Sequence, residues 1–166
     1  VETLFLLGEE RRIIGVSNYV VRPKEAQSLP KVSMFTSSSY EKIEALSPDL
    51  ILGFSDIQSD IAKDLIKRGH NVFISNHRSL DEILSYIILL SSMVGAPKKG
   101  EKLVSELKRK LQQTKGYLKK DIKVYFEEWD KPMISAIRWV SDLITNLGAV
   151  DIFREESFGS LAKERF

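Results

Sequence analysis

The sequence predicts an α/β fold in which parallel strands alternate with helices. Two short apolar runs bounded by turn residues, 50–54 and 71–75, are typical of buried parallel strands. Helical periodicity follows each run, and this alternation implies right-handed crossovers between parallel strands. A third observation is the charged segment 98–119, which predicts a helix of about 20 residues and roughly 30 Å. A helix of that length suits a connection between two lobes better than a place in one compact layer.

The first part of the chain predicts one short helix and two extended pieces. Residues 2–7 form the helix, and Gly8 closes it, because a residue without Cβ adopts the left-handed conformation of a C-terminal cap at little cost. Residues 13–16 predict a short strand, and we expect residues 32–35 to be another short extended piece.

Two capping boxes mark predicted helix starts. In a capping box, a serine and a glutamate three residues later bond each other's backbone N–H groups. Ser38 with Glu41 predicts a helix that stops at Ser-Pro-Asp, residues 47–49, and Ser79 with Glu82 predicts one that runs to about residue 94. Between them, isoleucine and leucine recur every four residues over 57–65, which predicts a further helix ending at a glycine.

The chain after the long helix repeats the alternation once. Residues 122–126 predict a strand, Trp139 opens a helix that Gly148 closes, and residues 151–153 are expected to be extended. We therefore divide the chain into an N-terminal lobe (1–96), an inter-lobe helix (97–119) and a partial C-terminal lobe (120–166).

Composition excludes several functional classes. The chain has 166 residues, a 43% apolar share, 25 basic and 23 acidic side chains, no cysteine and two histidines. The apolar share is that of a folded protein, and the near balance of charge gives no reason to expect a nucleic-acid partner. Thiolate chemistry is excluded, and a histidine-rich metal site is not expected. The longest apolar run, 83–94, is too short for a bilayer, which needs about 20 residues.

The stretch 123–130 is the most informative part of the sequence. It reads as a strand that brings Glu127, Glu128 and Trp129 to its end, and Trp139 follows shortly after. Ligands of open α/β sheets bind at the carboxyl ends of strands. Because the chain has only two tryptophans and both lie here, we expect Glu128, Trp129 and Trp139 to contact a ligand.

Other aromatic and polar residues follow the remaining predicted strands. Tyr19, Phe35 and Phe54 suit a large planar ligand, since aromatic faces stack on it; ordinary packing is the alternative. His77 follows the strand 71–75 and could reach a ligand, although a loop histidine is often simply solvated. Arg138 could bind an anionic group, or it could pair with the aspartate one helical turn later.

Catalysis is the weaker interpretation. Glu127 and Glu128 could suggest glycosidase chemistry, but that reaction needs two carboxyls facing across a bond, about 5–10 Å apart. Neighbours on a strand point to opposite faces. The sequence also contains no glycine-rich phosphate loop and no nucleophile elbow. We therefore predict a non-catalytic protein, with no cofactor and no metal site, and keep an α/β enzyme using Glu127 or Glu128 as an alternative.

These landmarks, in this order, resemble the substrate-binding proteins of ABC importers for cobalamin and iron–siderophore complexes. The resemblance covers nearly the whole chain, and its last part is similar to a subgroup labelled cobalamin-binding. The matching pieces are Glu2-x-Leu-Phe-x-Leu-Gly8, Ile14-Gly-Val-Ser-x-Tyr19 with Pro23, Val32-Ser33, Glu41-x-Ile-x-x-Leu46, Pro48-Asp-Leu-Ile51, Gly69-x-x-Val72, the long Lys/Glu helix, and 125–153.

The resemblance implies two Rossmann-like lobes with parallel sheets, joined by one long helix, with the ligand between the lobes. It implies a periplasmic or extracellular, membrane-tethered protein that delivers cobalamin or a ferric siderophore to a permease and its ATPase. A haem- or metal-binding relative of the same fold is the alternative. In this family acidic surface residues pair with permease arginines, and the candidates here are Asp56 and Asp60. The family has a strand before Glu2 and more of the second lobe after Phe166, so the chain looks truncated at both ends.

Overall fold

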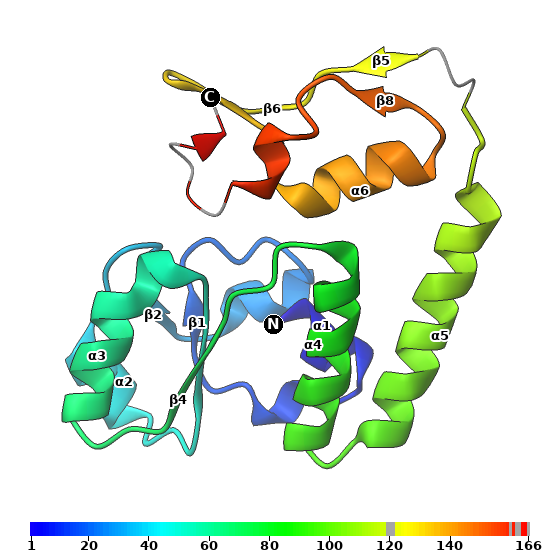
Figure 1. The fold of residues 1–166 in the computed structure, drawn as a ribbon. Coiled ribbons are helices and arrows are strands. Elements are labelled where there is room, and N and C mark those ends of the chain that lie inside the picture. Colours follow the sequence, from blue (N-terminus) through cyan, green and yellow to red (C-terminus); the bar gives the residue numbers. More distant parts are fainter. Residues whose placement is uncertain (119–121, 160, 162–163, 166) are drawn as a thin grey trace. The chain divides into compact units, whose positions relative to one another are not determined.

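A computed structural model describes residues 1–118, 122–159, 161 and 164–165. The chain divides into two compact units (Figure 1). Unit 1 comprises Val1–His77 and Leu89–Gly100, and unit 2 comprises Arg78–Ile88 and Glu101–Phe166. Parallel strand pairs alternate with helices in the chain, which confirms the predicted α/β class. The lobe limits predicted from the sequence stay a prediction.

Unit 1 contains two pairs of parallel strands. β1 (Val16–Ser17) pairs with β2 (Lys31–Ser33), and β3 (Ile51–Phe54) pairs with β4 (Val72–Ser75), with Phe54 opposite Ser75. The remaining elements are α1 (Glu2–Leu6), α2 (Tyr40–Ala45), α3 (Ser59–Lys67), the end of α4 (Leu80–Met93), the start of α5 (Pro97–Thr114) and 3₁₀ turns at Glu10–Arg12, Lys24–Ser28 and Asp56–Gln58. The expected strand at 13–16 is wrong except at Val16.

The two predicted capping boxes have different outcomes. Glu82 and Ser79 form the expected box: the Glu82 carboxylate accepts from the Ser79 N–H (2.9 Å), and the Glu82 N–H donates to Ser79 Oγ (3.2 Å). The Ser38 box is wrong, because α2 begins one residue later with Ser39 as its N-cap. Residues 37–39 pair back on β2, and the Ser39 N–H donates to the carbonyl of Val32, so Ser38 stays extended.

The described part of unit 2 contains one parallel strand pair and one antiparallel hairpin. β5 (Lys123–Val124) pairs with β8 (Val150–Asp151), and β6 (Glu127–Asp130) pairs with β7 (Met133–Ser135). The helix α6 (Arg138–Asn146) contributes Val140 and Ile144 to a small apolar core. The first turns of α4 pack on α5 through Leu84, Ile87 and Val104. A 3₁₀ turn, Glu156–Phe158, lies near the end of the chain.

The strand predicted at 122–126, running into Glu127–Trp129, is shorter than expected. β5 ends at Val124, and residues 127–130 belong to the separate hairpin β6–β7. Met133–Ser135 supply the second strand of that hairpin, for which the sequence carries no strand prediction. A short turn at Lys131–Pro132 joins the two strands, and register between Glu127 and Trp129 is irregular.

The long helix also ends earlier than predicted. α5 stops at Thr114, so the helix predicted for residues 115–118 is wrong. Residue 119, the predicted end of the helix, lies outside the described residues. The side-chain amide of Asn146 donates to the carbonyl of Leu111 (3.0 Å) and to Thr114 Oγ1 (3.2 Å), which caps the helix. Gly116 then turns the chain with a φ of 69°. Within the described residues, no helix combines the length and apolar character needed to cross a bilayer.

Candidate functional site

Three of the predicted ligand-binding residues lie close together in unit 1. Phe35 follows β2, Phe54 is the last residue of β3 and His77 follows β4, and we call these three residues the aromatic cluster. The rings of Phe54 and His77 lie 4.8 Å apart between centroids. The His77 ring is oriented by a 2.6 Å hydrogen bond between its Nδ1 and Ser75 Oγ. Phe35 and Phe54 are 49% and 39% exposed, so both rings offer apolar surface to a ligand.

Gln58 joins two members of this cluster. Its side-chain carbonyl accepts from the Phe54 N–H (2.9 Å), and its amide group donates to the Phe35 carbonyl (3.1 Å). Sequence reasoning missed Gln58, because nothing in a lone glutamine within a 3₁₀ turn signals long-range contacts.

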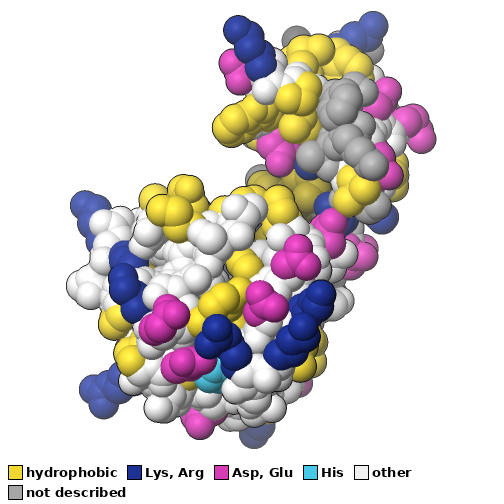
Figure 2. All heavy atoms as spheres, turned by 90° about the vertical axis from the view of Figure 1, so that its left-hand side faces the viewer, with side chains coloured by type: hydrophobic (Ala, Val, Ile, Leu, Met, Phe, Trp, Pro, Cys, Tyr) yellow, Lys and Arg dark blue, Asp and Glu magenta, His cyan; other side chains and the backbone are white. Residues whose placement is uncertain are grey.

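Tyr19 and the two docking candidates also belong to unit 1. Tyr19 follows β1 and is 64% exposed, with its N–H bonded to Ser17 Oγ. Asp56 lies in the 3₁₀ turn before α3, where its carboxylate accepts from Ser55 Oγ (3.2 Å), and Asp60 lies in the first turn of α3. Both aspartates are exposed. On the face drawn in Figure 2, acidic and basic side chains are interspersed, so that face carries no broad region of one charge.

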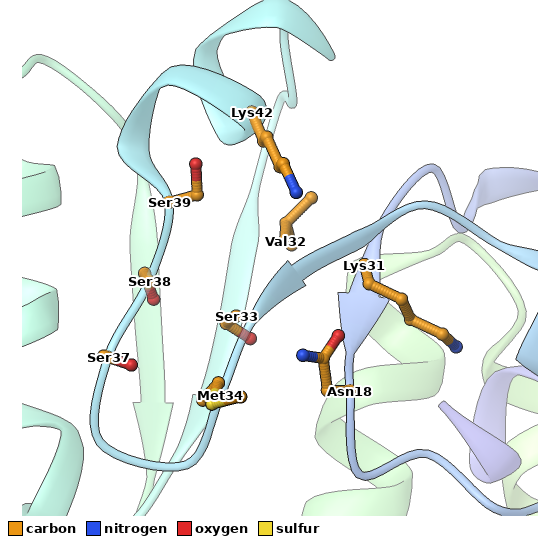
Figure 3. Close-up of a pocket in the computed structure, with 9 residues that line it drawn as sticks. All are labelled: Asn18, Lys31, Val32, Ser33, Met34, Ser37, Ser38, Ser39 and Lys42. Atoms are coloured by element: carbon orange, nitrogen blue, oxygen red, sulfur yellow. The ribbon is translucent and has the colours of Figure 1, made fainter.

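An open pocket of about 300 Å³ adjoins the ends of β1 and β2 in unit 1 (Figure 3). Asn18 precedes Tyr19 and Met34 precedes Phe35, so the pocket shares two loops with predicted ligand-binding residues. Lys31 turns its ammonium away to the carbonyl of Ala26 (3.4 Å). The serine hydroxyls, which both donate and accept hydrogen bonds, and the Lys42 ammonium make the pocket largely polar. The full lining is Asn18, Lys31, Val32, Ser33, Met34, Ser37, Ser38, Ser39 and Lys42.

Unit 2 holds both tryptophans. Trp129 lies on β6 and is 60% exposed, and its indole N–H donates to the Lys131 carbonyl (3.1 Å). Trp139 lies in the first turn of α6 and is 36% exposed; its backbone N–H donates to the Arg78 carbonyl (2.8 Å). Each indole therefore retains apolar surface in unit 2.

The charged candidates of unit 2 are engaged in contacts within that unit. Glu128 forms an ion pair with Arg165, whose side chain is only 5% exposed. The Arg165 backbone carbonyl in turn accepts from the N–H (2.8 Å) and Oγ (2.7 Å) of Ser135, so this residue ties both strands of the β6–β7 hairpin to the end of the chain. Sequence reasoning missed Arg165, because its partners lie 30 and more positions away.

Arg138 and Glu127 have aromatic neighbours. The Arg138 guanidinium lies over the Phe158 ring, 4.9 Å from the centroid. The suggested partner of Arg138, Asp142, instead lies 4.0 Å from the guanidinium of Arg154. Desolvation, together with the hydrogen bond from its hydroxyl to Glu127 (3.1 Å), raises the pKa of Tyr125.

The described side chains indicate what kind of ligand the protein suits. Among the described residues, no group of three or more His, Cys, Asp and Glu side chains is placed to hold a metal ion. What the structure offers is exposed aromatic surface at strand ends in unit 1 and on the hairpin and α6 in unit 2. Such surfaces suit the binding of a large, partly apolar molecule.

Comparisons with known proteins agree on one protein family. The family model described as "Periplasmic binding protein" matches residues 1–165. A vitamin B12-binding protein of Vibrio cholerae is 28% identical over 160 residues, covering 93% of this chain and 58% of the relative. The chain thus spans less than two thirds of the length of that relative.

Two solved structures are similar in fold. The periplasmic vitamin B12-binding protein of Vibrio cholerae has a TM-score of 0.75 and 28% identity, with 92% of this chain and 62% of that chain covered. A periplasmic haem-binding protein of Roseiflexus sp. RS-1 has a TM-score of 0.76 and 21% identity, with 93% and 62% covered. At 21% identity the second comparison supports the fold alone.

Proposed function

The chain belongs to the periplasmic binding protein family, and from this premise we propose that it is part of the solute-binding component of an ABC importer. Its ligand would be cobalamin or a related corrinoid or iron complex, captured between two lobes. The protein would be periplasmic or extracellular and membrane-tethered, and it would deliver the ligand to a permease with its ATPase. The similarity to vitamin B12-binding proteins over 93% of the chain supports this ligand class.

The observation that carries the proposal is the aromatic cluster of unit 1. Phe35 and Phe54 are both exposed at strand ends and are joined through Gln58, and exposed apolar side chains that are grouped mark interaction sites, whereas single ones are common. Aromatic faces give a large ligand contact area at a low entropic cost. We propose as ligand-binding residues Tyr19, Phe35, Phe54, His77, Glu128, Trp129, Arg138 and Trp139.

A fluorescence titration tests this proposal. The protein, expressed with whatever sequence flanks these residues in its gene, is titrated with vitamin B12 and with a ferric siderophore. We expect quenching by one of them that saturates at one equivalent. The Phe54→Ala variant should bind at least tenfold more weakly, since burying a phenylalanine side chain against the ligand contributes about 1.5–3 kcal/mol. Unchanged fluorescence with both ligands would refute the proposed ligand class.

Haem or metal binding is the second candidate. The fold similarity to a haem-binding protein and the position of His77 beside Phe54 favour testing it. The absorbance spectrum of haem would shift when a histidine binds its iron, and the His77→Ala variant would lose that shift. An α/β enzyme using Glu127 or Glu128 is a weaker alternative, because Glu128 is paired with Arg165. Turnover that disappears in either Glu→Gln variant would favour it.

Docking on the permease is the remaining part of the proposal. Asp56, just before α3, and Asp60, in its first turn, are exposed, and we propose that they pair with basic residues of the permease. Asp56→Lys and Asp60→Lys should weaken binding to the permease and leave ligand affinity unchanged. Glu10→Lys, at an exposed acidic position elsewhere in unit 1, is the control. Equal docking of all three variants and the wild type would contradict this assignment.

A further inference from the structure

Gln58 connects two segments of unit 1 that lie far apart in sequence. Its carbonyl oxygen accepts from the Phe54 N–H at 2.9 Å, and its amide nitrogen donates to the Phe35 carbonyl at 3.1 Å. Exchanging the oxygen and the nitrogen would set donor against donor and acceptor against acceptor, so both contacts depend on a single orientation of the amide.

The backbone around Gln58 is built to hold it there. The Gln58 N–H donates to the Ser55 carbonyl (3.2 Å), and the Ser55 N–H donates to the Ser75 carbonyl at the end of β4 (2.8 Å). Ser55 has a φ of 69°, a conformation that costs a non-glycine residue free energy and persists where surrounding contacts fix it. The turn that carries Gln58 is therefore anchored to the β3–β4 pair.

Gly53 makes the space that the amide occupies. A Cβ at position 53 would lie 2.9 Å from the side-chain oxygen of Gln58 and 2.4 Å from Ile74 Cδ1. Because Gly53 does not have a positive φ, the glycine is needed for this close approach and not for its backbone conformation. The amide thus sits against β3 in a site that only a glycine leaves open.

We propose that Gln58 is a positioning residue that holds the Phe35 loop at a fixed place relative to Phe54 and His77. The inference rests on the proposed function in taking this cluster as part of the ligand site. A loop that is already fixed before the ligand binds loses less conformational freedom on binding, so the ligand is held more tightly. Affinity differences between related complexes arise mostly in the dissociation rate. Gln58 therefore sets ligand residence time without having to touch the ligand.

The test compares two substitutions of Gln58 with a matched control. Gln58→Leu removes both hydrogen bonds, whereas Gln58→Glu keeps an acceptor for the Phe54 N–H and loses the donor to the Phe35 carbonyl. Asn71→Ala is the control, because Asn71 donates from its side chain to the Asp49 carbonyl (3.1 Å) at the opposite end of the same strand pair. Amide hydrogen exchange of unit 1 and dissociation of vitamin B12, or of haem if that is the ligand, are measured.

Gln58→Leu should speed exchange of the Phe54 amide about tenfold and dissociation of the ligand about tenfold, the size expected for two lost hydrogen bonds. Gln58→Glu should keep the Phe54 amide protected but speed dissociation, since only the Phe35 loop is released. Asn71→Ala should change neither quantity. Unchanged Phe54 exchange in Gln58→Leu would overturn the inference, as would faster exchange with unchanged ligand dissociation.

The proposed function and this inference fail in distinguishable ways. If the wild-type protein binds none of vitamin B12, a ferric siderophore and haem, the proposed ligand class is wrong. The exchange rates of Phe54 and of residues 34–37 then decide by themselves whether Gln58 holds the loop.

Discussion

The two units support their exposed aromatic side chains by different means. In unit 1, Phe35 follows β2 and Phe54 ends β3, and a neutral amide, that of Gln58, ties their backbones together. In unit 2, Trp129 projects from an antiparallel hairpin that a buried guanidinium, that of Arg165, holds through Glu128 and Ser135. A neutral amide costs little to expose, whereas a buried charge left without its partner is costly. We therefore expect the hairpin of unit 2 to be the more sensitive to single substitutions.

The largest predicted effect is an asymmetry within the ion pair of unit 2. Glu128→Ala leaves the Arg165 guanidinium buried without its carboxylate, and we expect it to lower the free energy of unfolding of unit 2 by about 2–3 kcal/mol, at the low end because Glu128 is partly exposed. Arg165→Met removes the buried charge and leaves a half-exposed carboxylate in water, so about 1 kcal/mol should be lost. Both tryptophans lie in unit 2, so urea unfolding followed by tryptophan fluorescence reports on this unit. Equal losses in the two variants would contradict the asymmetry.

The second prediction tests the neutral support of unit 1. Gly53→Ala brings a Cβ against Gln58 and Ile74, and overpacking of this kind costs about 1–2 kcal/mol. Because the displaced atoms include the Gln58 oxygen, the Phe54 amide should also exchange faster. The Gly69→Ala variant is an informative contrast: no atom lies within 4 Å of its Cβ position, and its cost should come from a φ of 88° alone, with the Phe54 amide unaffected. Slow Phe54 exchange in Gly53→Ala would show that the amide relaxes without losing its bond.

The third prediction compares the two helix starts. Ser79 accepts from the Glu82 N–H, whereas Ser39, the N-cap of α2, makes no capping bond with its side chain. Ser79→Ala should therefore lower the free energy of unfolding by about 1 kcal/mol and Ser39→Ala by only a few tenths. Circular dichroism during urea unfolding gives both values. A loss of similar size in both variants would mean that Ser39 contributes in another way.

The smallest predicted effect is a pH dependence in unit 2. Hydrogen bonds from the backbone N–H groups of Arg78 and Ser79 lower the pKa of Glu82 from its ordinary value of 4.5. Because the folded pKa lies below the unfolded one, the unfolded chain binds the proton first; the stabilisation is present above pH 4.5 and is lost as the pH falls through the folded pKa. In the Glu82→Gln variant the free energy of unfolding should therefore fall less in acid than in the wild type, by about 1 kcal/mol at most. Urea unfolding at pH values from 3 to 7 measures this difference. An identical acid decline in wild type and variant would contradict the assignment.

Local patterns sufficed for the regular elements of the fold. The apolar runs that became β3 and β4, the periodicity of α3 and the capping box of α4 depend on residues within about one turn or one strand of each other. The same patterns put Phe54 and His77 at adjacent strand ends, and the structure has their rings in contact. That Phe54 and His77 form one ligand site with the predicted ligand-binding residues of unit 2 stays a prediction.

The sequence by itself determined the α/β class, the family and the ends of β3 and β4 that carry Phe54 and His77, because those signals are repeated locally and tolerate small errors of boundary. The tertiary structure decided where α5 ends, how the segment after Val124 folds, and which residues fix the aromatic side chains. Each of these depends on a bond between distant positions: Asn146 to Leu111, Arg165 to Glu128, and Gln58 to Phe35. A side-chain amide or guanidinium can bond any backbone carbonyl within reach, so its partner follows from the folded arrangement and not from the residue type.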